Sequence, residues 1–261
     1  MITHTALIHI VLTYTFLSNG NVSMVTIAIK SRFNKNTFEH QAWEKNMLVA
    51  GIDEVGRGCL AGPVVTAAVI LQPNKISRLI KDSKLLTPEE LHKAYQWIIK
   101  NSWYSIGIIH HRDIDQYNIY HATLRAMKRS LMQILHTCPK APSKILIDAM
   151  PLQLTQPPFD SLEIVHFIKG ELRSSSIAAA SIIAKVKRDQ MMRIFDPALP
   201  GYDLKSHKGY STPNHKKMIS QLQHSIIHRS TFIKDKNYFL ESSDATQQSL
   251  ITSEEKNIDL L

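Results

Sequence analysis

Two adjacent carboxylates, Asp53 and Glu54, follow a short apolar segment (residues 48–50) and lead into a Gly-Arg-Gly turn at 56–58. The β-branched run that begins at Val64 predicts a strand on the far side of this turn. Neighbouring side chains of a regular strand point to opposite faces, so both carboxylates can reach one point only if their strand ends there. Glycines permit such a bend. Paired acids at a bend suit a hard divalent cation, and the segment therefore predicts a metal site.

Two further acids could complete such a site. Asp148 ends a second apolar strand, as Asp53 does, so both can lie at one edge of a sheet. Asp189 follows Ser181 and Lys185 at intervals of four residues, which places all three on one helix face. Taken singly, a strand-ending Asp commonly caps a turn, and a Lys–Asp pair is commonly a solvated helix face. Together the four acids fit a pair of divalent ions about 3.5–4 Å apart, the arrangement that cleaves phosphodiesters in line.

The elements that must position these residues are strands and helices in alternation. A capping box, Thr87-Pro88-Glu89-Glu90, opens one helix. The other predicted elements are strands at 64–71, 103–109, 144–147 and 162–167, and helices at 118–135 and 177–192. This order predicts an α/β fold with a mixed central β-sheet flanked by helices.

Composition favours a globular protein with a polyanionic partner. The 261 residues are 44% hydrophobic and 20% charged, and the net charge is +9. A basic body suggests nucleic acid, although many basic proteins bind none. Two cysteines, Cys59 and Cys138, are too few for a disulfide framework or a zinc set, which favours the reducing cytoplasm.

The ends of the chain differ from its middle. Residues 1–29 contain no Asp, Glu, Lys or Arg, so a signal peptide must be considered. A basic n-region and a cleavage site are missing and the apolar run is short, so we favour Met24 as the start over secretion and expect no membrane association. The predicted organisation is an uncharged leader (1–24), an N-terminal extension (25–47), one folded domain (48–235) and a polar, disordered tail (236–261).

Two rival sites are weaker. The glycines of 56–62 could form a dinucleotide-binding loop, but such a loop must open a helix, whereas here Pro63 and a β-branched strand follow. Two carboxylates would also face the phosphates, and we reject this interpretation. His224 and His228 could form a metal pair. No Cys or acid nearby completes a zinc set, so surface or core histidines are favoured.

Seven motifs in a fixed order resemble the ribonuclease HII family, over about residues 48–235. They are GIDEVGRGCLAGPVV (51–65), DSKLL (82–86), NIYHATLRAM (118–127), ILIDAM (145–150), SIAAASIIAKVKRD (176–189), HKGYSTPNH (207–215) and HRSTF (228–232). The resemblance implies a ribonuclease H-like fold with a small helical C-terminal part. It also implies Mg²⁺- or Mn²⁺-dependent hydrolysis of RNA paired to DNA, and incision at single ribonucleotides embedded in duplex DNA, leaving 3′-hydroxyl and 5′-phosphate ends.

The resemblance assigns roles by position. The family's four metal-binding acids match Asp53, Glu54, Asp148 and Asp189. The turn whose backbone contacts the 2′-hydroxyl of the ribonucleotide matches Gly56, Arg57 and Gly58. Only glycine lets a backbone approach a sugar so closely, and the 2′-hydroxyl is what separates RNA from DNA.

Other matched positions concern the rest of the substrate. Tyr210 matches the aromatic residue that packs on the adjacent deoxyribose and would clash with a second 2′-hydroxyl. Phosphate or site-supporting contacts are expected from Lys84, Ser181 and Lys185. The chain departs from the family's usual residues at Cys59 (proline), Ala149 (glycine) and Glu171 (aspartate). None of these changes removes a metal ligand, so activity is expected.

Two alternative functions remain for such a chain. A ribonuclease HIII usually carries an extra N-terminal substrate-binding domain, and the 47 residues before the domain are too few for one. An inert nucleic-acid-binding protein on the same fold would be indicated by a missing acid, and all four are present. The leading hypothesis is a monomeric, cytoplasmic ribonuclease HII whose partners are RNA–DNA hybrid and ribonucleotide-containing duplex DNA.

Overall fold

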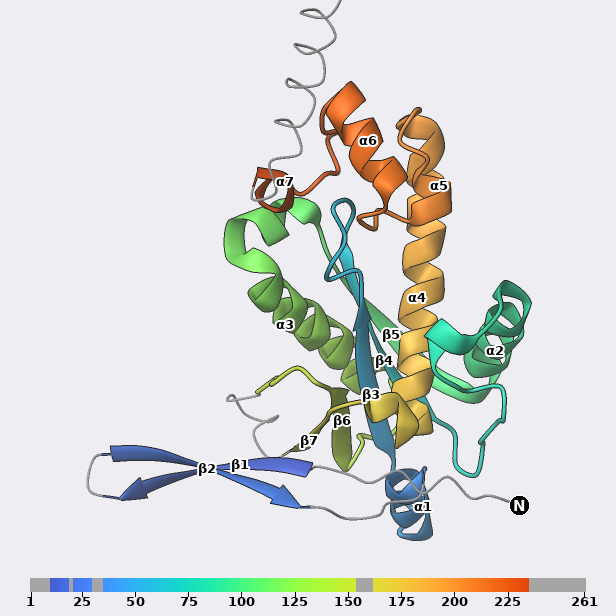
Figure 1. Cartoon of the computed structure of the whole chain (residues 1–261). Helices are drawn as coiled ribbons and strands as arrows, with labels where there is room; N and C mark the ends of the chain where they lie inside the picture. The colour runs from blue at the N-terminus through green and yellow to red at the C-terminus, as the bar shows by residue number, and fades with distance from the viewer. Residues whose placement is uncertain (1–9, 19–20, 30–34, 154–161, 235–261) are drawn as a thin grey trace, which may run out of the picture.

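The structure of the protein is a computed structural model that describes residues 10–18, 21–29, 35–153 and 162–234 (Figure 1). The predicted polar tail, 236–261, lies outside the described residues, as do the first nine residues of the leader. Within the leader and the N-terminal extension, β1 (Ile10–Ser18) and β2 (Asn21–Ile29) pair as a separate antiparallel two-stranded sheet.

A five-stranded sheet in the order β5-β4-β3-β6-β7 forms the centre of the fold. β3, β4 and β5 are antiparallel neighbours, whereas β6 and β7 run parallel to β3, which confirms the predicted mixed sheet. β4 is buried along its whole length, and this burial accounts for its continuous apolar run. The strands are β3 Val49–Val55, β4 Val64–Leu71, β5 Ser102–Ile109, β6 Lys144–Asp148 and β7 Glu163–Phe167.

Helices cover both faces of this sheet (Figure 1). α3 (His111–Thr137) shares an apolar core with β3, β4 and β6 on one face. α4 (Ser175–Phe195) and α2 (Pro88–Asn101) pack on the other. A Cβ at Gly51 of β3 would lie 2.2 Å from the carbonyl carbon of Ser176, so glycine is what lets α4 lie directly on this strand.

Local signals in the sequence mark two helix starts. The Thr87 hydroxyl accepts the Glu90 N–H (3.2 Å) and the Thr87 N–H donates to the Glu90 carboxylate (2.9 Å), which confirms the predicted capping box. α3 begins earlier than predicted, at His111, and is interrupted at Asn118, whose φ of 66° is not helical. The Asn118 side chain accepts the His121 N–H (3.1 Å) and caps the second segment, which is the helix that the sequence predicted.

A helix that the sequence analysis missed, α1 (Thr37–Glu44), meets the N-terminus of α4. The buried Glu39 carboxylate accepts hydrogen bonds from the Ser174 hydroxyl (2.5 Å) and the Ser176 N–H (3.0 Å). The Asn36 side-chain oxygen accepts a hydrogen bond from the Ser175 N–H (3.0 Å). Because the first amides of a helix have no acceptor within it, α1 supplies the acceptors that α4 needs.

Short helices at the end of α4 form the predicted small C-terminal part (Figure 1). They share an apolar core with the last turns of α4 and with the loop after β3. These helices are α5 Leu204–His207, α6 Pro213–Leu222 and α7 Ser230–Lys234. Single 3₁₀ turns are η1 Ser83–Leu85, η3 Gly170–Leu172 and η4 Asp196–Ala198. In the described part of the chain, no helix is both long enough and apolar enough to cross a membrane.

Candidate active site

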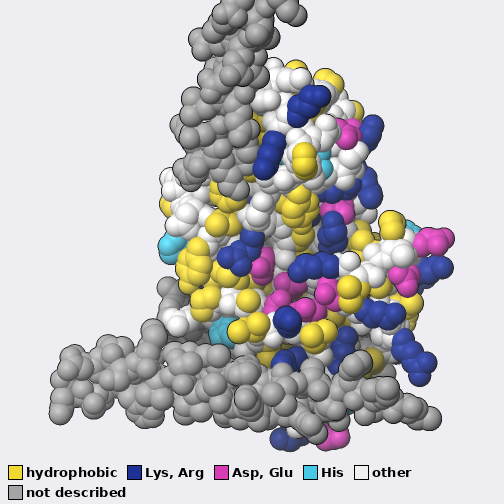
Figure 2. Space-filling model, viewed as in Figure 1, with side chains coloured by type: hydrophobic (Ala, Val, Ile, Leu, Met, Phe, Trp, Pro, Cys, Tyr) yellow, Lys and Arg dark blue, Asp and Glu magenta, His cyan; other side chains and the backbone are white. Residues whose placement is uncertain are grey.

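A cavity of about 160 Å³ lies at the point where β3 and β6 stop pairing with each other. It brings together three of the four predicted metal-binding acids and most of the predicted substrate contacts. On the face of the molecule drawn in Figure 2, acidic side chains gather in the middle, with Lys and Arg side chains around them. The cavity is lined by Asp53, Glu54, Val55, Asp82, Ser83, Lys84, Asp148, Glu171, Ser181, Lys185 and Tyr210.

Strand pairing explains how the acids meet. The last β3–β6 pair joins Ile52 to Ile147, so the next residue of each parallel strand, Asp53 and Asp148, is an acid at the same edge. The prediction that β3 ends at Asp53 was wrong. On the edge away from β6, β3 stays paired with β4 through Asp53 and Glu54 as far as Val55. Glu54 nevertheless lines the same cavity, since β6 no longer covers β3 at this level.

The cavity holds negative charge that the chain compensates only in part. Burial raises the pKa of Asp53 well above its usual value, and the Glu54 and Asp148 carboxylates raise it further. Burial also raises the pKa of Glu54, against the effect of Arg57, whose Nη1 lies 3.3 Å from Glu54 Oε1. The other Glu54 oxygen, Oε2, is buried and accepts no hydrogen bond within the described chain. A bound cation would satisfy this oxygen and relieve the repulsion.

This donor set fits a hard divalent cation such as Mg²⁺ or Mn²⁺, because the acids that line the cavity offer carboxylate oxygens and no His or Cys of the described chain lines it. Among the described residues, no three His, Cys, Asp or Glu side chains are arranged to hold one ion. A metal would therefore require the side chains of Asp53, Glu54 and Asp148 to turn toward a common point.

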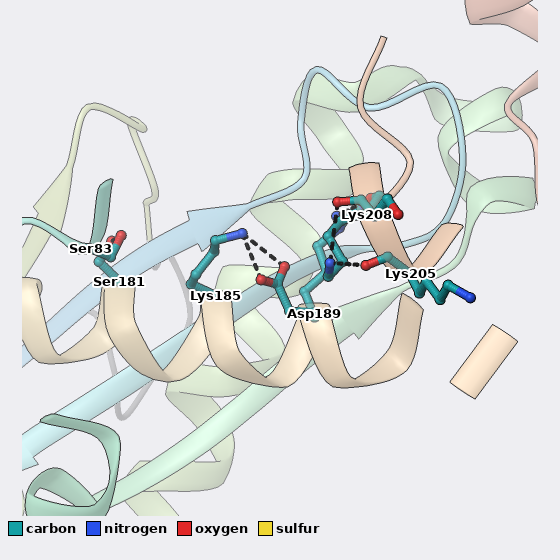
Figure 3. A network of polar contacts seen from close by, with 8 residues as sticks. Ser83, Ser181, Lys185, Asp189, Lys205 and Lys208 are labelled. Carbon is teal, nitrogen blue, oxygen red and sulfur yellow. Dashed lines mark hydrogen bonds and ion pairs between the residues drawn. The ribbon is translucent and has the colours of Figure 1, made fainter. Parts of the chain in front are cut away.

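Asp189, the fourth predicted acid, lies next to this cavity and not in its lining. It lines an adjoining cavity of about 430 Å³, and its two oxygens accept hydrogen bonds from Lys185 Nζ at 2.9 and 2.8 Å (Figure 3). Ser181, Lys185 and Asp189 lie along one face of α4, as their spacing predicted (Figure 3). The Ser181 hydroxyl lies 3.0 Å from that of Ser83. The helix thus delivers Ser181 and Lys185 to the acids, while Asp189 is paired with Lys185.

Two buried arginines that the sequence analysis did not single out hold the turn at 56–58. Arg229 donates to the carbonyl oxygens of Gly56 (2.6 Å), Arg57 (2.8 Å) and Gly62 (2.9 Å). Arg188 donates to two more carbonyls of the same loop and to one of the loop before Tyr210. Their only signal in the sequence was their place within two of the motifs. Backbone carbonyls offset the cost of burying both guanidinium groups and fix the turn.

The two glycines of this turn have different surroundings. Gly56 has a φ of +91°, and a Cβ there would lie 2.2 Å from Arg188 Nε, so the fold itself requires glycine. Gly58 has no left-handed φ, and a Cβ there would meet no atom of the described chain within 4 Å. Folding therefore does not explain glycine at 58, and the space beside it is open to a ligand.

Tyr210 lies beside the carboxylates and is 37% exposed. Its ring centroid is 5.9 Å from Lys185 Nζ and 5.6 Å from Arg188 Cζ. Burial raises the pKa of its hydroxyl, and the neighbouring Cys59 thiol raises it further. Cys59 is fully buried and burial raises its pKa, as expected for a filler and not for a nucleophile.

Other predictions concerned residues near this site. Glu171, noted in the sequence only as a departure, lines the cavity, and burial raises its pKa. Asp82 also lines the cavity. The only indication of this in the sequence was its place in the DSKLL motif. His224 is exposed and His228 is buried, which confirms that these are surface and core histidines.

Comparisons with known proteins find relatives in sequence and in fold. The sequence profile of the family described as Ribonuclease HII matches residues 50–235. A Ribonuclease HII of Enterococcus faecalis is 46% identical over 202 residues, covering 76% of this chain and 75% of the relative.

Two solved structures share the fold. The ribonuclease H2 from Pyrococcus horikoshii OT3 has a TM-score of 0.60 at 24% identity, covering 74% of this chain and 97% of that one. Bst-RNase HIII in complex with Mn²⁺ has a TM-score of 0.61 at 18% identity, covering 83% and 76%. The profile match spans more than half of the chain, and the chain therefore belongs to the ribonuclease HII family and is a ribonuclease H-type hydrolase.

Proposed function

We propose that this enzyme is an endonuclease that hydrolyses the RNA strand of RNA–DNA hybrids and incises duplex DNA at single embedded ribonucleotides, leaving 3′-hydroxyl and 5′-phosphate ends. The observation that carries the proposal is the meeting of Asp53, Glu54 and Asp148 at one cavity. A cluster of carboxylates with uncompensated charge repels a phosphodiester unless cations lie between them, and cleavage of such a bond is the chemistry that two divalent ions perform.

In this proposal Asp53, Glu54, Asp148 and Asp189 hold two divalent cations, Mg²⁺ or Mn²⁺. Such ions supply an activated water and stabilise the leaving oxygen. Asp189 has to leave Lys185 in order to join the other acids, and the Lys185 ammonium then becomes available for a phosphate oxygen. Bst-RNase HIII shares this fold and was crystallised in complex with Mn²⁺, which supports a divalent ion here.

The turn at 56–58 would read the ribose. Its backbone groups approach the 2′-hydroxyl through the open space beside Gly58, where any side chain would stand in the way. Tyr210 would pack against the deoxyribose on the 3′ side, where a second 2′-hydroxyl has no room. Lys84 and Lys185 line both cavities and would contact phosphates, and Ser181, which lines the cavity of the acids, would support the site.

Cleavage of a labelled duplex with one embedded ribonucleotide tests this function. We expect a single cut at the ribonucleotide with Mg²⁺ or Mn²⁺, a 3′-hydroxyl and a 5′-phosphate at the cut, and no cut in EDTA. An all-DNA duplex of the same sequence is the matched control and should stay intact. Cleavage in EDTA, or equal cleavage of the control, would contradict the proposal.

We also propose that the enzyme acts as a cytoplasmic monomer. Cys59 and Cys138 are both unpaired and buried, which fits a reducing compartment. Light scattering during size-exclusion chromatography should give the mass of one chain, 29.7 kDa. A mass of two chains would contradict the monomer, and recovery of the protein outside the cytoplasmic fraction would contradict the location.

A further inference from the structure

A row of hydrogen bonds crosses the C-terminal helical part and ends on the backbone of Tyr210. The N–H and hydroxyl of Ser225 lie 2.9 and 2.8 Å from His228 Nδ1. His228 Nε2 lies 3.0 Å from His215 Nε2, and His215 Nδ1 lies 2.8 Å from the Tyr210 carbonyl oxygen. Both rings are buried, with 0% exposure for His215 and 2% for His228. We call these three residues, Ser225, His228 and His215, the histidine link.

The partners at each end fix the direction of every hydrogen bond in the histidine link. A carbonyl oxygen can only accept, so His215 Nδ1 must carry a proton and donate it to Tyr210. An amide N–H can only donate, so His228 Nδ1 must accept from Ser225. His228 Nε2–H therefore donates to His215 Nε2. All four ring nitrogens are satisfied while both rings stay neutral, and burial keeps them so by lowering the pKa values to about 4 and about 3.

The backbone just before Tyr210 needs this support. Lys208 and Gly209 both have left-handed φ angles, 53° and 82°, and a Cβ at Gly209 would lie 2.5 Å from the Ala61 carbonyl oxygen. A non-glycine residue in this conformation is strained and persists only where its surroundings hold it. His207 accepts the Gly209 N–H at Nδ1 (3.1 Å), and its ring stacks on His215 with 4.0 Å between centroids.

We propose that the histidine link positions Tyr210 over the carboxylate cavity and thereby sets the preference for an embedded ribonucleotide over a continuous hybrid. Neither His215 nor His228 lines the cavity, so both act through the Tyr210 main chain as positioning residues. The inference rests on the proposed function, in which the Tyr210 ring packs on a deoxyribose. A small displacement of that ring weakens the embedded site and matters little on a hybrid, where the tyrosine has less room to help.

Three substitutions of one residue separate positioning from simple stability. His215→Asn keeps an amide donor close to the Nδ1 position and can still reach the Tyr210 carbonyl. His215→Gln places its amide near Nε2, so it keeps the contact with His228 and loses the one with Tyr210. His215→Leu removes both contacts. His224→Leu is the matched control, since His224 is an exposed histidine in the same segment and outside the histidine link.

The measurement is kcat and KM on both substrates, well below the melting temperature of each variant. We expect His215→Gln and His215→Leu to lower kcat on the embedded site by about tenfold, with a smaller loss on the hybrid and little change in KM. His215→Asn should restore most of the wild-type ratio of the two rates, and His224→Leu should keep it. If His215→Leu fails to fold, the Asn and Gln variants alone decide, because they are similar polar side chains with different reach.

Two outcomes would overturn the inference. One is an equal loss on both substrates; the other is a wild-type ratio of rates in the Gln variant. Failure of the proposed function looks different, because the wild-type enzyme would then show no preference for the embedded site, or Tyr210→Ala would leave that preference unchanged.

Discussion

The carboxylate cavity and the histidine link both bury titratable groups beside Tyr210, and they treat charge in opposite ways. In the cavity the charges of Glu54 and Asp148 raise the pKa of Asp53, and Glu54 Oε2 has no hydrogen-bond partner in the described chain. In the histidine link every ring nitrogen has a partner and neither ring is charged. Burial by itself therefore does not mark a ligand-binding residue. Burial with charge left uncompensated does, because only a ligand can complete it.

The largest expected effect comes from removing one of the uncompensated charges. Asp53→Asn keeps the shape of the side chain and takes away a metal ligand, so cleavage should be abolished while duplex binding, dominated by phosphate contacts, persists. The raised pKa of Asp53 means that its ionised form destabilises the fold. The melting temperature of Asp53→Asn in EDTA at neutral pH should therefore be higher than that of the wild type.

Cleavage assays, duplex-binding titrations and thermal melts test these three expectations. Glu89→Gln, which removes an exposed acid, is the control and should change none of them. Near wild-type cleavage by Asp53→Asn, in protein freed of host nuclease, would remove Asp53 from the site.

Tyr210 connects the two regions, and its removal should give the next largest effect. Tyr210→Ala should slow cleavage at an embedded ribonucleotide by about 100-fold, because the sugar is no longer held against the metals. The loss should be smaller on a continuous hybrid. Single-turnover rates on both substrates test this, and an equal loss on the two would make Tyr210 a packing residue.

The two glycines of the 56–58 turn allow the same comparison on a finer scale. Gly58→Ala should slow cleavage by about tenfold with an unchanged melting temperature, since its Cβ meets no atom of the described chain but stands where the ribose would lie. Gly56→Ala should instead lower the melting temperature, because its Cβ would collide with Arg188. If Gly58→Ala kept full activity, close approach of this backbone to the substrate would be disproved.

Lowering the pH should change the free energy of unfolding in opposite directions through the two regions. Histidine has an ordinary pKa of 6.5, and folding lowers the pKa of His215 to about 4 and that of His228 to about 3. The unfolded chain therefore takes up protons first, and the free energy of unfolding should fall as the pH drops below about 6.5. Asp53 acts with the opposite sign, since its raised pKa makes the folded state gain its proton first.

Urea unfolding in EDTA at a series of pH values measures both contributions. Replacing both histidines with leucine should flatten the acid loss, and Asp53→Asn should steepen it. Parallel pH profiles for all three proteins would refute this assignment of the titrating groups.

The smallest effect is expected from the leader. Deleting residues 1–23 leaves α1 and every residue of the cavity in place, so melting temperature and single-ribonucleotide cleavage should match those of the full chain. A large loss in either would show that this segment belongs to the fold.

The sequence was informative wherever a single element carried the signal. The strand around Asp53, the capping box at Thr87 and the common face of Ser181 and Lys185 all depend on residues close together in the chain, and the structure has them as predicted. Asp53 meets Asp148 because β3 and β6 stop pairing one residue before each acid, although β3 itself continues. The roles of the cavity residues in binding metal and substrate stay predictions.

What the sequence could not supply were pairings between distant segments. Spacing placed Asp189 and Lys185 on one helix face. It did not predict that the Lys185 ammonium donates a hydrogen bond to the Asp189 carboxylate. Arg229 and Arg188 drew no prediction, because nothing local indicates that carbonyl groups far along the chain will surround them. The early end predicted for β3 failed for a similar reason, since its length depends on where β4 stops pairing.

The contact between α1 and α4 has a consequence for the order of folding during synthesis. Glu39 is separated by 135 residues from Ser174 and by 137 from Ser176, the two residues whose groups it accepts. It therefore leaves the ribosome long before its partners exist, and α1 must wait while all five strands of the central sheet are made. Such long-range contacts slow folding because a large loop has to close before they form. We expect the N-terminus of the helix that carries Ser181, Lys185 and Asp189 to be secured late, after the whole central sheet has been made and α4 can meet α1.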